Sequence, residues 1–158
     1  MKREIAVALG SGGAKGNSHI GVLRSLERAG YTISAIAGTS MGALVGAFYA
    51  AGYSPDEIEA VFTKVDQSKL YELGLLAQPG LLGLGKVVHL LDETLGEKTF
   101  ADTRIPCAFV AADLECNCEV ELSVGKLKDA VLASISVPGV FPPQKLNGHQ
   151  LVDGGVLN

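Results

Sequence analysis

The sequence predicts an α/β fold in which helices flank a mostly parallel central sheet. Short unbroken apolar runs alternate with helical patterns along the chain, and glycine-rich turns separate them. No apolar run approaches the roughly 18 residues that a membrane span needs. The 158 residues fit one domain, and a hydrophobic content of 47% is enough for a sizeable core.

The first half of the chain reads as strand, helix, strand, helix. Residues 5–9 form an unbroken apolar run, which is typical of a buried parallel strand. Apolar residues then recur at helical spacing from Ser18, and Gly30 is placed to end that helix. Residues 33–37 form a second short apolar strand, and residues 43–51 form a helix of small side chains. This order is typical of an α/β fold.

The second half of the chain continues the alternation. Residues 54–57 carry a capping serine, a proline and two acids, which start another helix. Residues 105–112 predict a third strand, and residues 119–124 alternate polar and apolar side chains like an edge strand or a hairpin arm. Residues 126–134 read as a helix, and residues 150–152 read as a last short strand.

The charge and the composition exclude several classes of function. The net charge is −4, the 13 basic residues are scattered and tryptophan is absent, so we expect no nucleic-acid partner. The apolar stretch near the N-terminus is too short for a signal peptide, so we expect a cytoplasmic protein.

The cysteines at positions 107, 116 and 118 are odd in number and irregularly spaced, which argues against a disulfide framework. No cluster of histidines accompanies them, so we expect no metal site. We assign Cys116 and Cys118 a structural role.

Residues 38–42, Gly-Thr-Ser-Met-Gly, fit the nucleophile elbow G-x-S-x-G. In that turn the serine sits on a strained strand-to-helix connection that exposes its hydroxyl, and the glycines leave room for close packing. The predicted strand before the turn and the predicted helix after it supply this setting. The helix would also direct the positive end of its dipole at a developing oxyanion. We therefore predict that Ser40 is a catalytic nucleophile.

Residues 10–16, Gly-Ser-Gly-Gly-Ala-Lys-Gly, join the first strand to the first helix. They form no P-loop, because Lys15 precedes Gly16, and no G-x-G-x-x-G, because Lys15 takes the third glycine position. A loop with several free backbone N–H groups at a helix N-terminus can stabilise a developing negative charge. The alternative is a plain tight turn, although seven residues exceed what a turn needs.

Two residues compete for the role of general base. A Ser-His-Asp triad needs a histidine after the serine, and His149 has that position, but Gly148-His149-Gln150 resembles an exposed hairpin turn. Asp153 ends an apolar run and precedes two glycines, so its carboxylate can point into a site from a tight loop.

Residues 70–91 hold nine leucines, interrupted by Pro79-Gly80 and by Gly83 and Gly85. Most clustered leucines are simply buried in a core. The alternative is the wall of an acyl-chain pocket or a lid with glycine hinges, in which Leu81 and Leu82 would contact an acyl chain.

Four motifs together resemble the patatin-like phospholipases, and in particular the bacterial branch related to neuropathy target esterase. They are the glycine-rich loop with residues 19–23, the elbow at residues 38–42, the block of residues 133–143, and Asp153-Gly-Gly. The resemblance spans residues 5–158, and four motifs in the right order make it specific.

The resemblance implies a patatin-like three-layer fold and a Ser–Asp dyad without a catalytic histidine. Ser40 would attack an acyl carbonyl and Asp153 would take its proton, while the backbone N–H groups of Gly12, Gly13 and Ala14 would line an oxyanion hole. The implied reaction is hydrolysis of phospholipid or lysophospholipid acyl esters, with no metal, calcium or other cofactor. We also expect transient, peripheral contact with a membrane surface.

Three features depart from the family pattern. Ser11 replaces a glycine that is often found in the loop. Lys15 stands where arginine is usual, which keeps the charge but loses the bidentate geometry, and we retain it as a candidate substrate-binding residue. The chain ends at Asn158, where relatives continue, so we expect residues 1–158 to be a catalytic domain truncated at its C-terminus.

Two other functions stay open. An acyltransferase could pass the same acyl group from Ser40 to an alcohol, although none of the four arginines stands in the motifs. A non-catalytic lipid-binding module is the second alternative, although all motif residues are intact.

Overall fold

The computed structural model describes residues 3–64 and 81–158, the side chains of 81–84 excepted. A mixed sheet runs through these residues in the strand order β1-β2-β3-β6-β5, and β4 pairs with β3. The strands are β1 Arg3–Leu9, β2 Tyr31–Thr39, β3 Cys107–Asp113, β4 Cys118–Leu122, β5 Gln144–Leu146 and β6 His149–Asp153.

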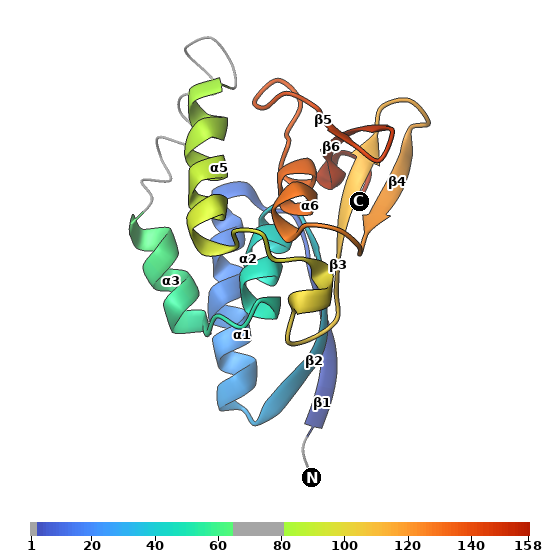
Figure 1. Ribbon diagram of the computed structural model, residues 1–158. Helices are drawn as coiled ribbons and strands as arrows, with labels where there is room; N and C mark the ends of the chain where they lie inside the picture. The colour runs from blue at the N-terminus through green and yellow to red at the C-terminus, as the bar shows by residue number, and fades with distance from the viewer. Residues whose placement is uncertain (1–2, 65–80) are drawn as a thin grey trace.

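The helices gather on one side of the sheet, with α3 and α5 outermost (Figure 1). They are α1 Ser18–Arg28, α2 Met41–Ala50, α3 Pro55–Lys64, α5 Leu81–Thr94 and α6 Leu127–Ser134, with short 3-10 turns η1 Gly13–Asn17, η2 Phe100–Asp102 and η3 Gly154–Val156. The opposite face of β1 and β2 exposes Ala6, Ala8 and Ala37. The predicted α/β class is confirmed, and within the described residues the helical layer covers one face.

The strand register brings three chain segments to one end of the sheet. β1 runs parallel to β2, with Leu9 opposite Gly38, and β2 runs parallel to β3, with Thr39 opposite Val110. β6 returns antiparallel to β3, so that Asp153 lies opposite Ala111. The glycine-rich loop after β1, the elbow after β2 and the end of β6 therefore meet.

Helix α2 is buried on every side, with Tyr49 as its one partly exposed residue. Its small side chains allow that position: a Cβ on Gly46 would already stand 3.4 Å from the Phe109 ring of β3. A helix that is apolar all round belongs inside the core. This burial fixes the start of α2, where the elbow lies, on a rigid element.

The predicted helix ends agree with the structure. Gly30 adopts a φ of 81°, as a glycine after a helix C-terminus does. Ser54 and Glu57 form a capping box at the start of α3, in which the Glu57 carboxylate accepts from the Ser54 N–H at 2.8 Å. The predictions for β1, β2, β3, β4, β6, α2 and α6 are confirmed to within a few residues.

Two elements were not predicted. Residues 81–94 form the helix α5, because Gly83 and Gly85 weaken a helix without ending it. The three-residue strand β5 is too short to show a pattern. No helix in the described part of the chain combines the length and hydropathy that a membrane crossing requires.

Candidate active site

Ser40 occupies the strained turn that its motif predicts. Its backbone has φ 56° and ψ −122°, a left-handed conformation that a non-glycine residue holds only where the surroundings enforce it. A Cβ on Gly38 would stand 2.4 Å from the Gly42 carbonyl oxygen, and a Cβ on Gly42 would stand 2.0 Å from that of Leu9. Both elbow glycines are therefore required by close backbone approach.

A serine from α6 holds the elbow in place. The Ser40 N–H donates to Ser134 Oγ at 2.9 Å, and Ser134 Oγ donates in turn to the Val110 carbonyl of β3 at 2.6 Å. Ser134 has no exposed surface. The chain of two buried bonds ties the Ser40 backbone to the central strand, which restrains the turn in its strained conformation.

Ser40 and Asp153 are in direct contact. Ser40 Oγ donates to Asp153 Oδ2 across 2.5 Å, and the Gly155 N–H donates to the other carboxylate oxygen, Oδ1, across 2.8 Å. The two side chains are 113 positions apart in the chain. The Asp153 backbone is fixed as well, because its N–H donates to the Ser136 carbonyl at 2.9 Å.

The environment of Asp153 changes its acidity. Burial raises the pKa of the Asp153 carboxyl, and hydrogen bonds from Ser40, Gly155 and Ser11 oppose that rise. Leu151 and Val152 are fully buried around it. A raised pKa suits a carboxylate to act as a base closer to neutral pH.

Two glycines let the Asp153 loop approach the sheet. A Cβ on Gly154 would stand 2.5 Å from the Val110 carbonyl oxygen, and Gly155 packs against the Ser11 side chain. The residues that follow are about half exposed, and one of them, Val156, lines the cavity beside the carboxylate.

The glycine-rich loop borders the same site. Gly12 and Gly13 line the cavity in front of Ser40, and neither N–H has an acceptor within the described residues. Gly13 has a φ of 51°, which strains any other residue, and a Cβ on Gly12 would stand 2.9 Å from the Gly16 nitrogen, so both positions favour glycine. His19 Nε2 donates to the Gly10 carbonyl at 2.8 Å and anchors the loop to α1.

Two residues of the loop lie outside the cavity wall. Ala14 and Lys15 are exposed, and neither is among the residues that line the cavity. The loop therefore presents Gly12 and Gly13 to the site, together with Ser11.

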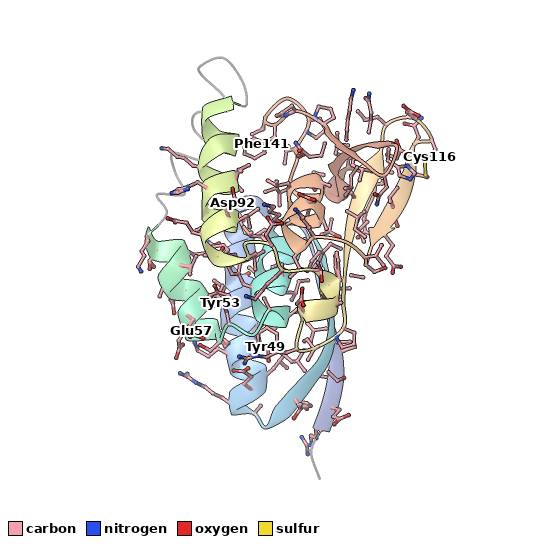
Figure 2. The ribbon with its side chains drawn as sticks, viewed as in Figure 1. Tyr49, Tyr53, Glu57, Asp92, Cys116 and Phe141 are labelled. Carbon is pink, nitrogen blue, oxygen red and sulfur yellow. A yellow bond between two sulfur atoms is a disulfide. The ribbon has the colours of Figure 1, made fainter. Side chains whose placement is uncertain are left out.

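An apolar cavity of about 300 Å³ opens in front of the Ser40–Asp153 pair. Its far wall comes from α2, α3, α5 and the segment after α6, and is formed by Met41, Leu44, Phe62, Val87, Leu90, Ile135, Val137 and Phe141. In Figure 2 the Phe141 side chain lies between α5 and α6 at this end of the molecule. The wall is shaped for a hydrocarbon group.

Part of the leucine-rich segment reaches this cavity. Val87 and Leu90 of α5 line it, while Leu91 is fully buried in the core, so the described part of the segment contributes to both the core and the cavity wall. Leu81 and Leu82 belong to α5, but their side chains lie outside the described residues.

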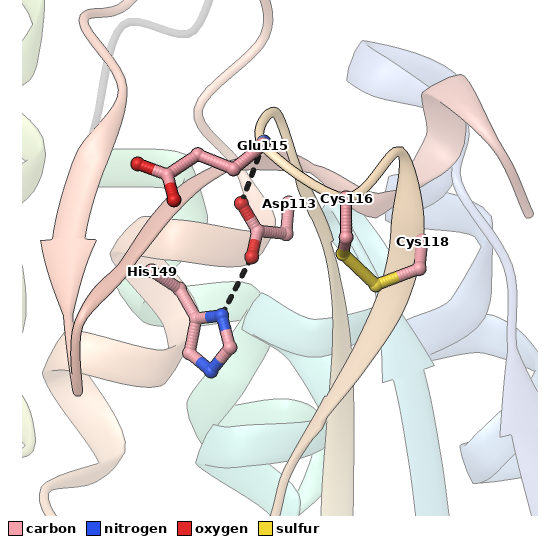
Figure 3. Close-up of a disulfide and its surroundings, with 5 residues drawn as sticks. All are labelled: Asp113, Glu115, Cys116, Cys118 and His149. Atoms are coloured by element: carbon pink, nitrogen blue, oxygen red, sulfur yellow. Dashed lines mark hydrogen bonds and ion pairs between the residues drawn. A yellow bond between two sulfur atoms is a disulfide. The ribbon is translucent and has the colours of Figure 1, made fainter.

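His149 does not take part in the site. It begins β6, and its Nδ1 lies 2.6 Å from Asp113 Oδ2, while Asp113 Oδ1 accepts from the Glu115 N–H at 2.9 Å (Figure 3). The predicted hairpin turn is present between β5 and β6, but the imidazole beside it, 44% exposed, has a partner that was not predicted, the buried Asp113 carboxylate. These bonds lower the pKa of Asp113, first through the Glu115 N–H and then through His149.

The structural role predicted for Cys116 and Cys118 takes a form that the sequence did not predict. Cys116 and Cys118 form a disulfide across the turn between β3 and β4, where Asn117 adopts a φ of 50° (Figure 3). Their spacing is too short to read as a disulfide framework, yet a tight hairpin turn brings the two sulfurs together. Cys107 is a free, half-buried thiol. No metal-binding cluster of acidic, histidine or cysteine side chains forms within the described residues.

The sequence assigned no role to three serines that lie beside the site: Ser11, Ser134 and Ser136. Ser134 and Ser136 belong to the block of residues 133–143, which carried a family resemblance but no assigned role. Ser134 Oγ accepts from the Ser40 N–H, and the Ser136 carbonyl accepts from the Asp153 N–H.

The sequence is similar to known families across almost its whole length. The profile of the family described as Patatin-like phospholipase matches residues 7–158. An NTE family protein of Mycobacterium bovis is 38% identical over 156 residues, which cover 98% of this chain and 43% of that protein. The neuropathy target esterase of Drosophila grimshawi is 32% identical and covers 98% of this chain and 11% of its own length. The chain thus spans less than half of these relatives.

Two solved structures share the fold. VipD from Legionella pneumophila superposes with a TM-score of 0.73 at 15% identity, over 99% of this chain and 46% of that one. ExoU in its complex with SpcU from Pseudomonas aeruginosa gives a TM-score of 0.60 at 20% identity, over 92% and 38% of the two chains.

Proposed function

Because the chain belongs to the patatin-like phospholipase family, we propose that it is a serine lipid acyl hydrolase that works through a Ser40–Asp153 dyad. The observation that carries the proposal is the 2.5 Å hydrogen bond between Ser40 Oγ and Asp153 Oδ2 at the head of an apolar cavity. The reaction is hydrolysis of a carboxylic ester, with phospholipids or lysophospholipids as substrates.

In the first half of the reaction Ser40 Oγ attacks the acyl carbonyl carbon while its proton passes to Asp153 Oδ2. The strained turn directs the hydroxyl at the cavity, and the raised pKa of Asp153 brings its basicity closer to that of a base working at neutral pH. The protonated Asp153 then gives the proton to the departing alcohol, which leaves an acyl-Ser40 ester.

The oxyanion of the tetrahedral intermediate would bind at the glycine-rich loop. Gly12 and Gly13 line the cavity with N–H groups that have no acceptor among the described residues. The N-terminus of α2, which begins at Met41, adds the positive end of its dipole beside Ser40. Donors of this kind act without reorganisation during the reaction. Ala14 is the third expected donor and stays a prediction.

In the second half of the reaction a water molecule replaces the alcohol. Asp153 takes a proton from the water, the resulting hydroxide attacks the acyl carbonyl, and the proton returns to Ser40 Oγ as the fatty acid leaves. Every proton is held at Ser40 or Asp153, so these steps need no cofactor.

The cavity wall supports an acyl chain as the bound group. Its side chains beyond the dyad are apolar, and such surfaces favour hydrocarbon over water by about 25 cal/mol per Å². A long-chain ester would be drawn from a membrane surface, which is why we retain transient membrane contact as part of the proposal. The acyltransferase alternative gains no support, since no arginine is among the described residues that line the cavity. A non-catalytic module gains none either, since Ser40 and Asp153 are hydrogen-bonded to each other at that cavity.

Labelling with a fluorophosphonate tests the proposal. The reagent phosphonylates an activated serine, so mass spectrometry should find the adduct on Ser40 alone. Ser40→Ala should lose labelling and several orders of magnitude in kcat on a short-chain ester. Ser25→Ala, in an exposed serine of α1 that bonds the Gly21 carbonyl, is the matched control and should keep wild-type activity. Retention of more than a tenth of the activity by Ser40→Ala would contradict the proposal.

A further inference from the structure

Ser11 stands at the point where the glycine-rich loop meets the Asp153 turn. A Cβ added to Gly155 would lie 2.3 Å from Ser11 Oγ, 3.1 Å from Ser11 Cβ and 3.0 Å from Asp153 Oδ1. The Ser11 hydroxyl therefore fills the space beside Gly155, next to the Asp153 carboxylate. Ser11 also lines the active-site cavity.

We propose that Ser11 is a positioning residue, whose hydroxyl, seated against Gly155, holds the Asp153 carboxylate in the orientation that accepts the proton of Ser40. The inference rests on the proposed dyad and assigns a role to a residue that makes no bond to Ser40.

The other contacts of Asp153 explain why such a residue matters. Oδ2 receives the Ser40 hydroxyl and Oδ1 receives the Gly155 N–H. Both donors approach from the chain segments that carry the dyad itself, whereas Ser11 comes from the loop after β1, with its hydroxyl against Gly155 on the Oδ1 side of the carboxylate. A carboxylate held by donors from different segments loses rotational freedom about its side-chain torsions, which keeps Oδ2 aimed at the nucleophile.

Ser11 also acts on the charge of the base. Burial raises the pKa of Asp153, and the Ser11 hydroxyl lowers it together with Ser40 and Gly155. No charged side chain among the described residues contributes to this balance. On the neighbouring strand β3, Asp113 lies two residues along from the partner of Asp153 and is bound to His149, and neither residue contacts Ser11 in any hydrogen bond found among the described residues.

Ser11 and Gly155 form a matched pair. A side chain at position 155 would displace the Ser11 hydroxyl, so the glycine is needed for the serine to reach the carboxylate. A glycine at position 11 would lack the hydroxyl that lies beside Gly155. Ser11 therefore lowers the pKa of the Asp153 carboxyl relative to the same loop with a glycine at position 11.

Ser11→Ala and Ser11→Gly remove the hydroxyl, and Ser11→Thr keeps it. In the two deletion variants the acidic limb of the kcat/KM pH profile on a soluble short-chain ester should move up by about half a pH unit or more, because each lost donor weakens the ionised form. We expect kcat on the plateau to fall by roughly three- to tenfold with KM nearly unchanged. Ser11→Thr and the control Ser25→Ala should keep the wild-type profile.

A carbon-13 NMR titration of the Asp153 carboxyl gives a readout that needs no turnover. Its midpoint should be higher in Ser11→Ala than in the wild type. An unchanged midpoint, with wild-type kcat and pH profile in both deletion variants, would overturn the inference. Failure of the proposed function would appear differently, as a wild-type protein whose Ser40 is not labelled, and the NMR comparison would then still decide the role of Ser11.

Discussion

Asp153 and Asp113 end two neighbouring antiparallel strands, and each is only 4% exposed. Their acidities nevertheless move in opposite directions. Burial dominates at Asp153 and raises its pKa, whereas the Glu115 N–H and His149 dominate at Asp113 and lower its pKa. Burial alone therefore does not decide what a carboxylate does; the partners at its oxygens do.

The two aspartates accordingly define two regions with different tasks. Asp153 meets a neutral hydroxyl beside an apolar cavity, where it can exchange a proton. Asp113 accepts hydrogen bonds from the His149 imidazole and the Glu115 N–H at the start of the disulfide-bonded hairpin turn. Its carboxylate there holds the turn and the start of β6 together. Figure 2 places Cys116 at the tip of this hairpin, away from Phe141 at the cavity. The first region resembles a reaction centre and the second a structural clamp.

The largest difference between the two regions should appear in activity. Asp153→Asn should lower kcat on a short-chain ester by several orders of magnitude, because an amide cannot take the Ser40 proton. Asp113→Asn should change kcat by less than about threefold once the folded fraction is taken into account. Equal losses in the two variants would break the distinction.

A second comparison sets a glycine that lines the cavity, Gly13, against a glycine that lies away from it, Gly125. Gly13→Val should lower kcat by roughly 10²-fold, the usual effect of losing one oxyanion donor. Gly125→Val is the matched control, since Gly125 also has a positive φ of 88° and open space around it but lies outside the cavity wall. Both variants should lose stability, and only the first should lose kcat in its folded fraction. A wild-type kcat in Gly13→Val would indicate that the loop is a tight turn without a role in the reaction.

The opposite pKa shifts predict opposite pH dependences of stability. The lowered pKa of Asp113 stabilises the fold above the unfolded value of about 3.9, and that contribution is lost as pH falls through the lower folded pKa. Asp113→Asn should therefore lower Tm at pH 7, and the difference from wild type should vanish in acid.

For Asp153 the sign reverses. Its raised pKa means that the ionised form destabilises the fold, progressively as pH rises from about 3.9 through the folded pKa. Asp153→Asn should keep or raise Tm at pH 7, by a few °C at most, with no advantage in acid. Thermal melts of both variants and the wild type across pH 3 to 8 check the two predictions. If the Tm difference from wild type changed with pH in the same way for both variants, the opposite pKa shifts would be contradicted.

Much of the fold can be predicted from patterns of neighbouring residues in the sequence. The apolar runs at residues 5–9 and 33–37, the glycine after α1 and the capping box at Ser54 each predict their element, because strand burial and helix capping depend on nearby residues. Helix α5 was not predicted, since its glycines read as hinges while its packing against the core decides the outcome.

The residues of the site likewise fall into those that the sequence predicts and those that it does not. The sequence predicts Ser40 through the geometry of its turn, and it brings Asp153 forward through the glycines that follow and through the family resemblance. It does not predict Ser134 or the Asp113–His149 pair, because these contacts join residues 94 and 36 positions apart and no local pattern specifies them. The Cys116–Cys118 disulfide depends likewise on the hairpin that closes around Asn117.

The most direct test of the dyad is the kcat of His149→Ala on the same short-chain ester that the wild type cleaves. His149 is bound to Asp113 and makes no contact with Ser40, so the account predicts a kcat within about threefold of wild type. The circular dichroism spectrum should show that the variant is folded. A folded His149→Ala with the activity of Ser40→Ala would contradict the dyad and leave Asp153 as an orienting residue.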